Sequence, residues 1–422
     1  MGKTHCKPAD VNIDDPAFNV PAVIKCFDGK LRRSDFRGVL IRLGGITNKE
    51  IAEERVAGKC EKIVKAEKQV AKVLTEERIQ KRNLRLAPIR QFKREDGLTH
   101  KMRDICQESP EQQLMEYMAV HALQPLFKAK LLDCQYGSIP GRGQVGGKRR
   151  IERILRRKYH NRADAVKGDI KKAYPSVTVE CVMRLLWRDI GKNKTLLWFL
   201  EALMSNYPGA HLCIGGYLPS WLFNYVMSYV LRYMMSCEAS RRGKSHRLVL
   251  SVICYADDFT IFGRFSNLRK TMKKTAAWAE QTLGLRMKPA WQVYHIASFE
   301  AEKAQHEERK AGSKKRTPGV DMMGYMVFRT YTIIRGRVFR RMHRQLIRAG
   351  RELASLGYVP CWRAAKLTAY KGWLKYSNSE AYCAKHDLAK LLYKAAQSVS
   401  RRGRKEWIEH EQRILCAAST GG

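Results

Sequence analysis

The clearest pattern in the chain is a pair of short apolar runs on either side of a polar turn. The runs, LVLSVIC (248–254) and FTIFG (259–263), are rich in the branched and aromatic residues that fit a pleated, half-buried strand. The four residues YADD (255–258) lie between them. The pattern therefore predicts a β-hairpin whose turn carries two neighbouring acids, Asp257 and Asp258.

A third acid follows another short apolar stretch. Asp169 lies near the end of AVKGDI (165–170). Because side chains alternate between the two faces of a strand, neighbouring aspartates need not both point at one ligand, and a third carboxylate is needed to complete a site. An isolated pair of aspartates is more often a surface turn. Here the apolar flanks and the distant partner favour a metal site.

The physical reason to gather carboxylates is their mutual repulsion. Two of them about 4 Å apart repel by roughly 1 kcal/mol in water and by about 4 kcal/mol at an effective dielectric of 20. Divalent cations relieve this repulsion, and Mg²⁺ prefers oxygen ligands. Two such ions about 3.5–4 Å apart can hold the attacking and leaving oxygens of a phosphoryl displacement.

Helical patterns occupy much of the remaining chain. Ser109 followed by Pro110 is typical of a helix start, and Ser266 is predicted to cap an amphipathic helix. The first 45 residues show little periodicity, so we expect an extension without a defined pattern there. Helical segments are predicted within 48–81, 109–127, 217–235, 266–285 and 338–415.

The segment 217–235 is apolar enough to resemble a membrane span. It contains Pro219, Asn224 and Arg232 in an otherwise highly charged chain, so we interpret it as a buried helix. The first residues lack the apolar core of a signal peptide. The 12 cysteines show no metal-like spacing and are typical of reduced thiols. We therefore expect a cytoplasmic protein without a membrane partner.

The charge of the chain points to a polyanionic partner. There are 80 Lys and Arg residues against 40 Asp and Glu, a formal net charge of +40. Such a charge destabilises a compact protein by self-repulsion unless a polyanion binds, and nucleic acid is the usual one. A glycine-rich basic stretch, YGSIPGRGQVGGKRR (136–150), supplies Arg142, Lys148 and Arg149 as candidate phosphate contacts.

With its acidic elements placed in this order, the chain resembles a reverse transcriptase over roughly residues 85–345. GDIKKAYPSV (168–177) is similar to the first palm motif of that family, and YADD is similar to its third. The resemblance implies catalysis by Asp169, Asp257 and Asp258 with two Mg²⁺ ions. It also implies Tyr174 as a steric gate against the 2′-hydroxyl. The metal-site residues that it implies are Asp169, Ile170, Asp257 and Asp258.

Further motifs extend the resemblance to substrate and nucleic-acid contacts. REDGLTHKMRDI (94–105) is similar to a fingers segment and implies that Lys101 and Arg103 bind the incoming triphosphate. IGGYLPSWLFNYVMSYVLRYM (214–234) is similar to the second palm motif, where Ser220 is a candidate substrate contact. The remaining candidate nucleic-acid contacts are Tyr255 in YADD and, in the MGY segment (323–325) similar to a primer grip, Gly324 and Tyr325.

Two positions depart from the family pattern. Many relatives carry a glutamine in the second palm motif, whereas Trp221 follows Ser220 here. The fourth motif commonly ends in a lysine, but in GLRMKPAWQV (284–293) that place holds Trp291, with Lys288 nearby as a substitute substrate contact. Neither change removes an implied metal ligand, so activity is still expected.

The resemblance implies an α+β fold with the right-hand architecture of a polymerase, built on an antiparallel palm sheet between basic helical ends. The expected parts are a basic extension (1–82), fingers (83–164), a palm (165–328) with a charged insertion (299–319), and a thumb with a C-terminal helical part (329–422).

The expected function is RNA-directed DNA synthesis from deoxynucleoside triphosphates, with a structured noncoding RNA as template and an RNA–DNA duplex as product. Two lineages of the family fit the motif order, the enzymes of antiphage defence and those of diversity-generating retroelements. The second motif and the basic extension favour defence. A non-catalytic RNA-binding protein on a polymerase scaffold is the rival from another class.

Overall fold

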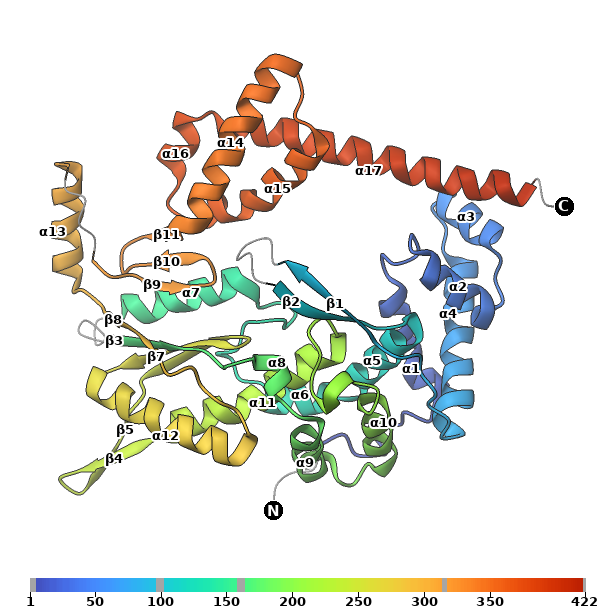
Figure 1. Cartoon of the computed structure of the whole chain (residues 1–422), viewed down its shortest axis with the longest axis horizontal. Helices are drawn as coiled ribbons and strands as arrows, with labels where there is room; N and C mark the ends of the chain where they lie inside the picture. Colours follow the sequence, from blue (N-terminus) through green and yellow to red (C-terminus); the bar gives the residue numbers. More distant parts are fainter. Residues whose placement is uncertain (1–4, 96–101, 158–163, 313–316, 420–422) are drawn as a thin grey trace.

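The computed structural model describes residues 5–95, 102–157, 164–312 and 317–419, and it combines many helices with small antiparallel sheets (Figure 1). The expected α+β class is confirmed. None of the helices in these ranges is long and apolar enough to cross a membrane. This agrees with the interpretation of 217–235 as a buried helix.

The largest sheet has four strands in the order β6-β7-β3-β8. Each neighbouring pair is antiparallel. The predicted hairpin forms, with β6 and β7 as its two strands and YADD at its turn. The strands are β3 (Asp164–Gly168), β6 (Ser251–Tyr255), β7 (Asp258–Gly263) and β8 (Gln292–His295).

Alternation along these strands buries a different apolar cluster on each face of the sheet. Val166 and Ile261 pack into the main core. Their neighbours Ala165 and Phe262 pack into a second core on the opposite face. The sheet is therefore apolar on both sides, which explains why the sequence of β6 and β7 is almost continuously apolar rather than alternating.

Two helices connect these strands and contact each other, α11 (Tyr217–Ser236) and α12 (Phe265–Leu283). The chain thus runs β3, α11, β6, β7, α12, β8, a split βαβ arrangement. The predicted cap at Ser266 is wrong, because α12 begins one residue earlier, after Arg264, without a side-chain cap. The segment before β3 adds α7 (Gly143–Arg156), which packs against β6, so half of the predicted glycine-rich loop is helical.

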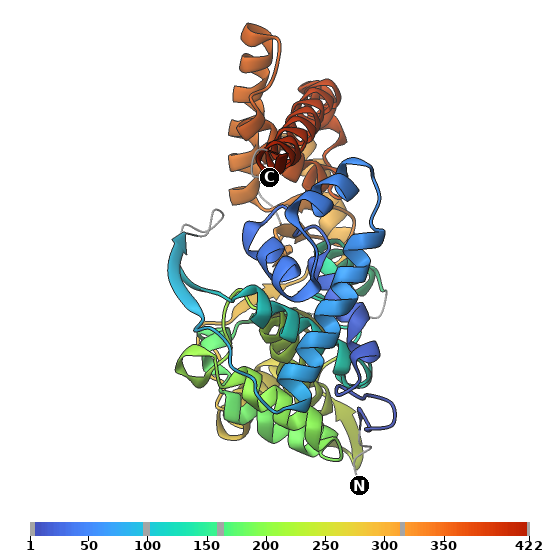
Figure 2. The same ribbon diagram turned by 90° about the vertical axis from the view of Figure 1, so that its right-hand side faces the viewer.

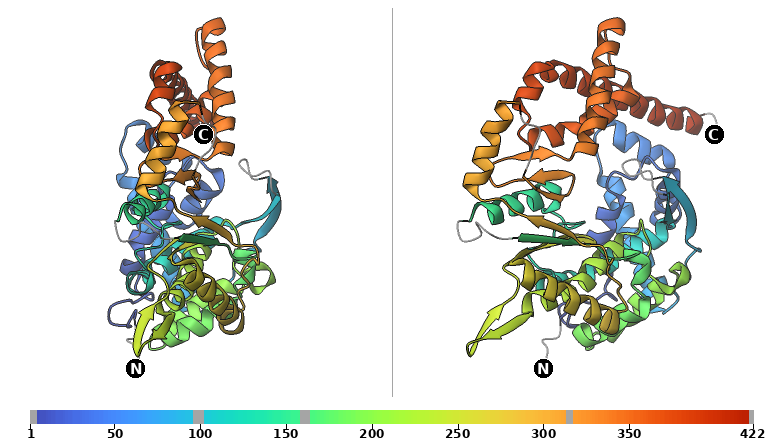
Figure 3. Two further views of the ribbon diagram at one scale, coloured as in Figure 1. Left: turned by 90° about the vertical axis from the view of Figure 1, so that its left-hand side faces the viewer. Right: turned by 60° about the vertical axis from the view of Figure 1, so that its left-hand side comes forward.

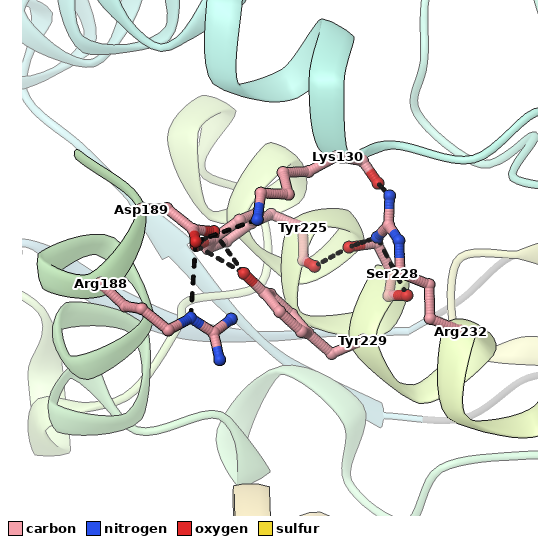
Figure 4. A network of polar contacts seen from close by, with 7 residues as sticks. All are labelled: Lys130, Arg188, Asp189, Tyr225, Ser228, Tyr229 and Arg232. Carbon is pink, nitrogen blue, oxygen red and sulfur yellow. Dashed lines mark hydrogen bonds and ion pairs between the residues drawn. The ribbon is translucent and has the colours of Figure 1, made fainter. Parts of the chain in front are cut away.

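Asp189 anchors α11 to its neighbours, as Figure 4 shows. It lies in α9 (Val179–Ile190) and accepts hydrogen bonds from Tyr225 (2.8 Å), from Tyr229 and from Lys130 (2.9 Å). Lys130 ends α6 (Gln124–Lys130), so three helices meet at one carboxylate. Burial alone would raise the pKa of Asp189, but the hydrogen bonds from Tyr229, Lys130 and Tyr225 outweigh it and lower that pKa. The network fixes the helix that runs beside the sheet.

The first 45 residues, for which no pattern was found, fold into two helices that join the main core. The helix expected over 48–81 is interrupted, because Gly58 adopts a left-handed φ of 66° after the first part ends. Ser109 caps its helix as predicted, accepting from the backbone N–H of Gln112. The N-terminal helices are α1 (Pro16–Phe27), α2 (Ser34–Gly44), α3 (Asn48–Val56), α4 (Glu61–Leu74) and its π-helical continuation (Thr75–Gln80). Of these, α1 and α2 pack against α5 (Pro110–Ala122).

Two hairpins and two short helices stand beside the main sheet. The hairpin of β1 and β2 extends to one side of the body in Figure 2 and in the left view of Figure 3. Most of its residues are exposed. These elements are β1 (Arg90–Glu95), β2 (Met102–Gln107), β4 (Glu238–Arg241), β5 (Lys244–Arg247), α8 (Ala173–Ser176) and α10 (Lys194–Met204).

The C-terminal part is helical, as predicted, and begins after a three-stranded sheet. The charged insertion contains a helix of its own, α13 (Phe299–Lys310). The other elements are β9 (Val320–Met322), β10 (Tyr325–Val327), β11 (Thr332–Ile334), α14 (Gly336–Leu356), α15 (Cys361–Lys375), α16 (Glu380–Lys385) and α17 (Leu388–Ser419).

The C-terminal helix α17 reaches back to α3 of the N-terminal helices, as Figure 1 and the right view of Figure 3 show. The contact includes a buried ion pair. Glu411 is fully buried and lies 2.6 Å from the guanidinium of Arg37 and 2.9 Å from that of Arg55. The N-terminal helices and the C-terminal helix are thereby joined across the molecule.

Replacing Glu411 by alanine is expected to release this contact, because it leaves the buried Arg37 and the partly exposed Arg55 without their shared carboxylate. Breaking a buried pair from one side costs about 3–5 kcal/mol. Hydrogen exchange should show loss of protection in α3 and in the last turns of α17, while the central sheet stays protected. Glu409→Ala, at a carboxylate that is 49% exposed and lies 3.7 Å from Lys405, should change protection little. Equal protection from exchange in the two variants would contradict a stabilising contact between Glu411 and the two arginines.

Candidate active site

The register of the central sheet brings the three predicted acids to one edge. Gly168 pairs with Phe259, so Asp169, the next residue after β3, lies beside Asp258, the first residue of β7. Tyr255 pairs with Asp258, which leaves Ala256 and Asp257 as the two-residue turn of the hairpin. Two strands far apart in sequence therefore deliver their carboxylates to the same place.

The pKa of Asp257 reflects the two acids near it. Burial raises its pKa most, and the neighbouring charges of Asp169 and Asp258 raise it further, to about 6. A carboxyl with a pKa raised in this way gains stability from a nearby positive charge. This is the environment in which a cation binds.

Two lysines supply positive charge to this edge. Lys288 forms an ion pair with Asp169, and its backbone N–H donates to the Asp169 carbonyl at 2.9 Å. Lys167 lies 3.1 Å from Asp258. Lys167 was not predicted from the sequence, although it precedes Asp169 by two residues and strand alternation puts both on one face.

The donor set is chemically suited to Mg²⁺. The Oδ1 atom of Asp169 is buried and has no hydrogen-bond partner, so one hard oxygen ligand is unused. Among residues 5–95, 102–157, 164–312 and 317–419, no three acidic, histidine or cysteine side chains are grouped so as to hold one metal ion. Lys167 and Lys288 contact two of the three carboxylates. The side chain of Ile170 is hydrocarbon and buried, so only its backbone oxygen can be a ligand.

Tyr174 lies near Asp257 and packs on α11. It belongs to α8, and its ring stacks on Phe223 of α11 with a centroid separation of 4.8 Å and an angle of 19°. Burial raises its pKa to about 12, and the charge of Asp257 contributes. Its ring is thus fixed against α11, within reach of the charge of Asp257.

The first part of the glycine-rich stretch packs directly on the YADD turn. The backbone N–H of Tyr136 donates to the carbonyl of Cys254 at 2.8 Å, so this segment extends the sheet beyond β6. A Cβ on Gly137 would lie 2.4 Å from the backbone nitrogen of Ala256, so the close approach requires glycine. The segment therefore supports the turn that carries Asp257.

An amide of α11 holds this segment in place. The side chain of Asn224 donates to the carbonyl of Gly137 at 2.9 Å, and Gln135 donates to the backbone carbonyl of Asn224 at 2.7 Å. Both side chains are almost fully buried. Asn224 was not predicted as a site residue, although it is the single amide side chain in the apolar sequence of α11.

The predicted basic contacts of this stretch differ in their surroundings. Arg142 donates to the carbonyls of Leu132 and Gln135 (3.0 Å to the latter), so its guanidinium stabilises the loop that precedes α7. Lys148 is buried and lies 2.9 Å from Glu152. Arg149 is exposed beside the ring of Tyr376, and of these three it is the one that presents its charge to solvent.

The predicted substrate contacts are spread over the β1–β2 hairpin and α11. Arg103 is exposed on β2, opposite Arg94. Lys101 lies outside the described residues. Ser220 is partly exposed in the first turn of α11 and donates to the carbonyl of Tyr217 at 2.8 Å. Trp221, the unusual residue after it, is buried and stacks on Phe127 rather than facing the acids.

The predicted primer-grip residues lie in the β9–β10 hairpin. Gly324 is at its turn, where a Cβ would come within 2.0 Å of the ring of Trp373 from α15. Tyr325 is buried on the second core, and burial raises its pKa to about 12. Tyr255, at the end of β6, is partly exposed and packs on the same core. The hairpin thus connects the central sheet to the C-terminal helices.

No model of a known protein family matches this chain, and a comparison with curated proteins found none that is significantly similar.

Adding a methyl group at Gly137 is expected to displace the turn, because its Cβ would overlap the backbone of Ala256. Gly137→Ala should lower the free energy of unfolding by about 1–3 kcal/mol, as other overpacked sites do. Urea unfolding measures the change. Gly38→Ala is the matched control, since a Cβ there meets no atom within 4 Å and alanine favours its helix. If both variants are as stable as the parent, the packing on the turn is not as described.

Proposed function

We propose that this protein is an RNA-directed DNA polymerase that copies an RNA template into complementary DNA. One observation carries the proposal. The pairing of β3 with β7 sets Asp169 beside the acids of the YADD turn, at one end of an antiparallel sheet. Carboxylates clustered at such an edge suit nucleotidyl transfer. In that reaction one metal-held oxygen attacks a phosphorus atom and another leaves it.

The arrangement of the chain supports a right-hand polymerase. The central sheet with α11 and α12 takes the part of a palm within 165–328. The exposed β1–β2 hairpin and α5 to α7 take the part of fingers within 83–164, and α14 to α17 that of a thumb with a C-terminal part within 329–422. The residues 1–82 add a helical block to this plan.

The acids would hold two Mg²⁺ ions, with Asp169 and Asp257 as the main ligands and Asp258 beside them. When bound, the ions would lower the barrier to attack by the primer hydroxyl and to release of pyrophosphate. Lys288 would exchange its contact with Asp169 for the triphosphate, and Arg103 would neutralise the same group. Tyr174 would leave no room for a 2′-hydroxyl.

The charge of the chain supports an RNA partner. A net charge of +40 over 422 residues favours a long polyanion, and a structured noncoding RNA supplies one. Such a template fits a role in antiphage defence, with sequence diversification as the alternative role.

A non-catalytic RNA-binding protein is the second candidate. The ion pairs of Lys288 with Asp169 and of Lys167 with Asp258 favour it, because they satisfy two of the three carboxylates without a metal ion. It predicts RNA binding that does not depend on Mg²⁺ and no incorporation of nucleotides.

Asp257→Asn is expected to abolish DNA synthesis and to leave RNA binding almost unchanged, because the amide keeps the shape of the side chain but loses the charge that holds Mg²⁺. Primer extension on an RNA template measures synthesis, and fluorescence anisotropy measures binding. Asp133→Asn is the matched control, since that side chain is 97% exposed. Extension by the Asp257 variant at the rate of this control would refute the assignment.

Tyr174→Ala is expected to admit ribonucleotides. Removing the ring opens space beside the sugar, so the preference for deoxynucleotides should fall by roughly 10-fold or more. Tyr174→Phe keeps the ring that stacks on Phe223 and should keep the preference. Competition between matched deoxy- and ribonucleoside triphosphates gives the ratio. An unchanged ratio in the alanine variant would exclude Tyr174 as the gate.

A further inference from the structure

The three-stranded sheet of β9, β10 and β11 packs on one face of the central sheet. On that face, Ala165 of β3 and Phe262 of β7 join Val320 of β9 in the second core. Thr260 lies two residues before Phe262 on β7, and its hydroxyl donates to the sulfur of Met322 at 3.6 Å. The strands β7 and β9 are therefore in direct contact.

Lys167 lies on this same face of β3. It follows Ala165 by two residues, and alternation places both side chains on one side of the strand. The Lys167 side chain is only 13% exposed, and a charge buried beside apolar groups needs polar partners. Its ammonium has two, the carboxylate of Asp258 at 3.1 Å and the backbone carbonyl of Asp321 at 3.3 Å. One cation thus connects the first residue of β7 with the middle of β9.

The connection continues from β9 into the C-terminal helices. The carboxylate of Asp321 accepts from the guanidinium of Arg335 at 2.5 Å. The backbone N–H of Arg335 donates to the carbonyl of Gly324, at the turn between β9 and β10, at 2.8 Å. Arg335 immediately precedes α14. The start of α14 is therefore fixed to the same hairpin that Lys167 holds from the other side.

Tyr294 of β8 gives a second sign that the two acids lie close together. It pairs with Ala165 in the central sheet, so its ring lies on the face that carries Lys167. Burial raises the pKa of its hydroxyl to about 12, and the charges of Asp321 and Asp258 both raise it further. Acids from two different sheets thus act on one hydroxyl, and Lys167 contacts both of these residues.

We propose that Lys167 is a positioning residue that holds Asp258 and β9 in a fixed relation, so that the acidic edge and the C-terminal helices keep one geometry. It acts on the acidic edge through Asp258 and on the second sheet through Asp321. The consequence for DNA synthesis rests on the proposed polymerase function, whereas the link between the two sheets does not.

A lysine that only neutralised Asp258 would behave differently. It would compete with a metal ion for the carboxylate, so its removal would lower the Mg²⁺ concentration that synthesis needs and leave the maximal rate intact. Loss of a positioning lysine instead lowers the maximal rate, because the acids are no longer held where the transition state requires them.

Hydrogen exchange of the whole chain tests the link without any synthesis. Lys167→Met keeps the length of the side chain and removes its charge. The amides of β9 and β10 should then exchange roughly 10- to 150-fold faster, the effect of losing a hydrogen bond to a charged group. Lys167→Arg should keep most of the protection, because a guanidinium can reach the same oxygens. Lys68→Met, at an exposed lysine of α4, should change neither strand.

Arg335→Gln is a second variant, at a side chain that is 33% exposed. It removes the ion pair with Asp321, so exchange in β9 and in the first turn of α14 should rise by up to roughly fivefold. Arg337→Gln, at an exposed position two residues further on, is the matched control. If Lys167→Met does not unfold cooperatively, Arg335→Gln and Lys167→Arg decide the test. Exchange equal to that of the parent in both Lys167→Met and Arg335→Gln would overturn the link.

Primer extension on an RNA template separates this inference from the proposed function. At saturating Mg²⁺, Lys167→Met should lower kcat roughly 10- to 100-fold and change the KM for deoxynucleotides by less than about threefold, and Lys167→Arg should recover most of the rate. A kcat equal to that of the parent in Lys167→Met, at the same or a lower Mg²⁺ concentration, would overturn the positioning role. If the parent makes no DNA but the exchange effects are found, the polymerase function fails and the link stands.

Discussion

Three carboxylates brought to one edge of the central sheet repel one another, and neighbouring residues must offset that repulsion. Asp169, Asp257 and Asp258 meet where β3 pairs with the β6–β7 hairpin, and the pKa of Asp257 is raised to about 6 by burial and by its two neighbours. Lys288 and Lys167 offset part of that repulsion. Keeping such an acidic cluster costs folding free energy, so a functional role is expected for it. Cation binding is the role that its chemistry suits best.

Helix α11 is the common support of this edge. Successive residues along it face different partners: Tyr217 and Ser220 line a cavity, Phe223 stacks on Tyr174, Asn224 holds the segment under the YADD turn, and Tyr225 is tied to Asp189. Its burial on several sides explains an apolar sequence that resembles a membrane span. A helix held at so many points is rigid, and a rigid helix can position a substrate beside it.

Local patterns predicted what depends on local chemistry. Strand alternation and apolar flanks located the hairpin and the strand before Asp169, and the Ser109 cap was found from its Pro110 neighbour. The start of α12 was misplaced, since its N-cap is Arg264 and no side chain caps it. The roles of Lys167 and Asn224 depend on pairings between distant segments, which no local pattern encodes.

The central claim is that the acidic edge supports templated DNA synthesis. The most direct measurement is to give the purified protein an RNA template annealed to a DNA primer, Mg²⁺ and four deoxynucleoside triphosphates, and to sequence the product. The account predicts extended DNA whose sequence is complementary to the RNA and whose formation stops when Mg²⁺ is chelated. Absence of extension, or DNA whose sequence is independent of the template, would contradict it.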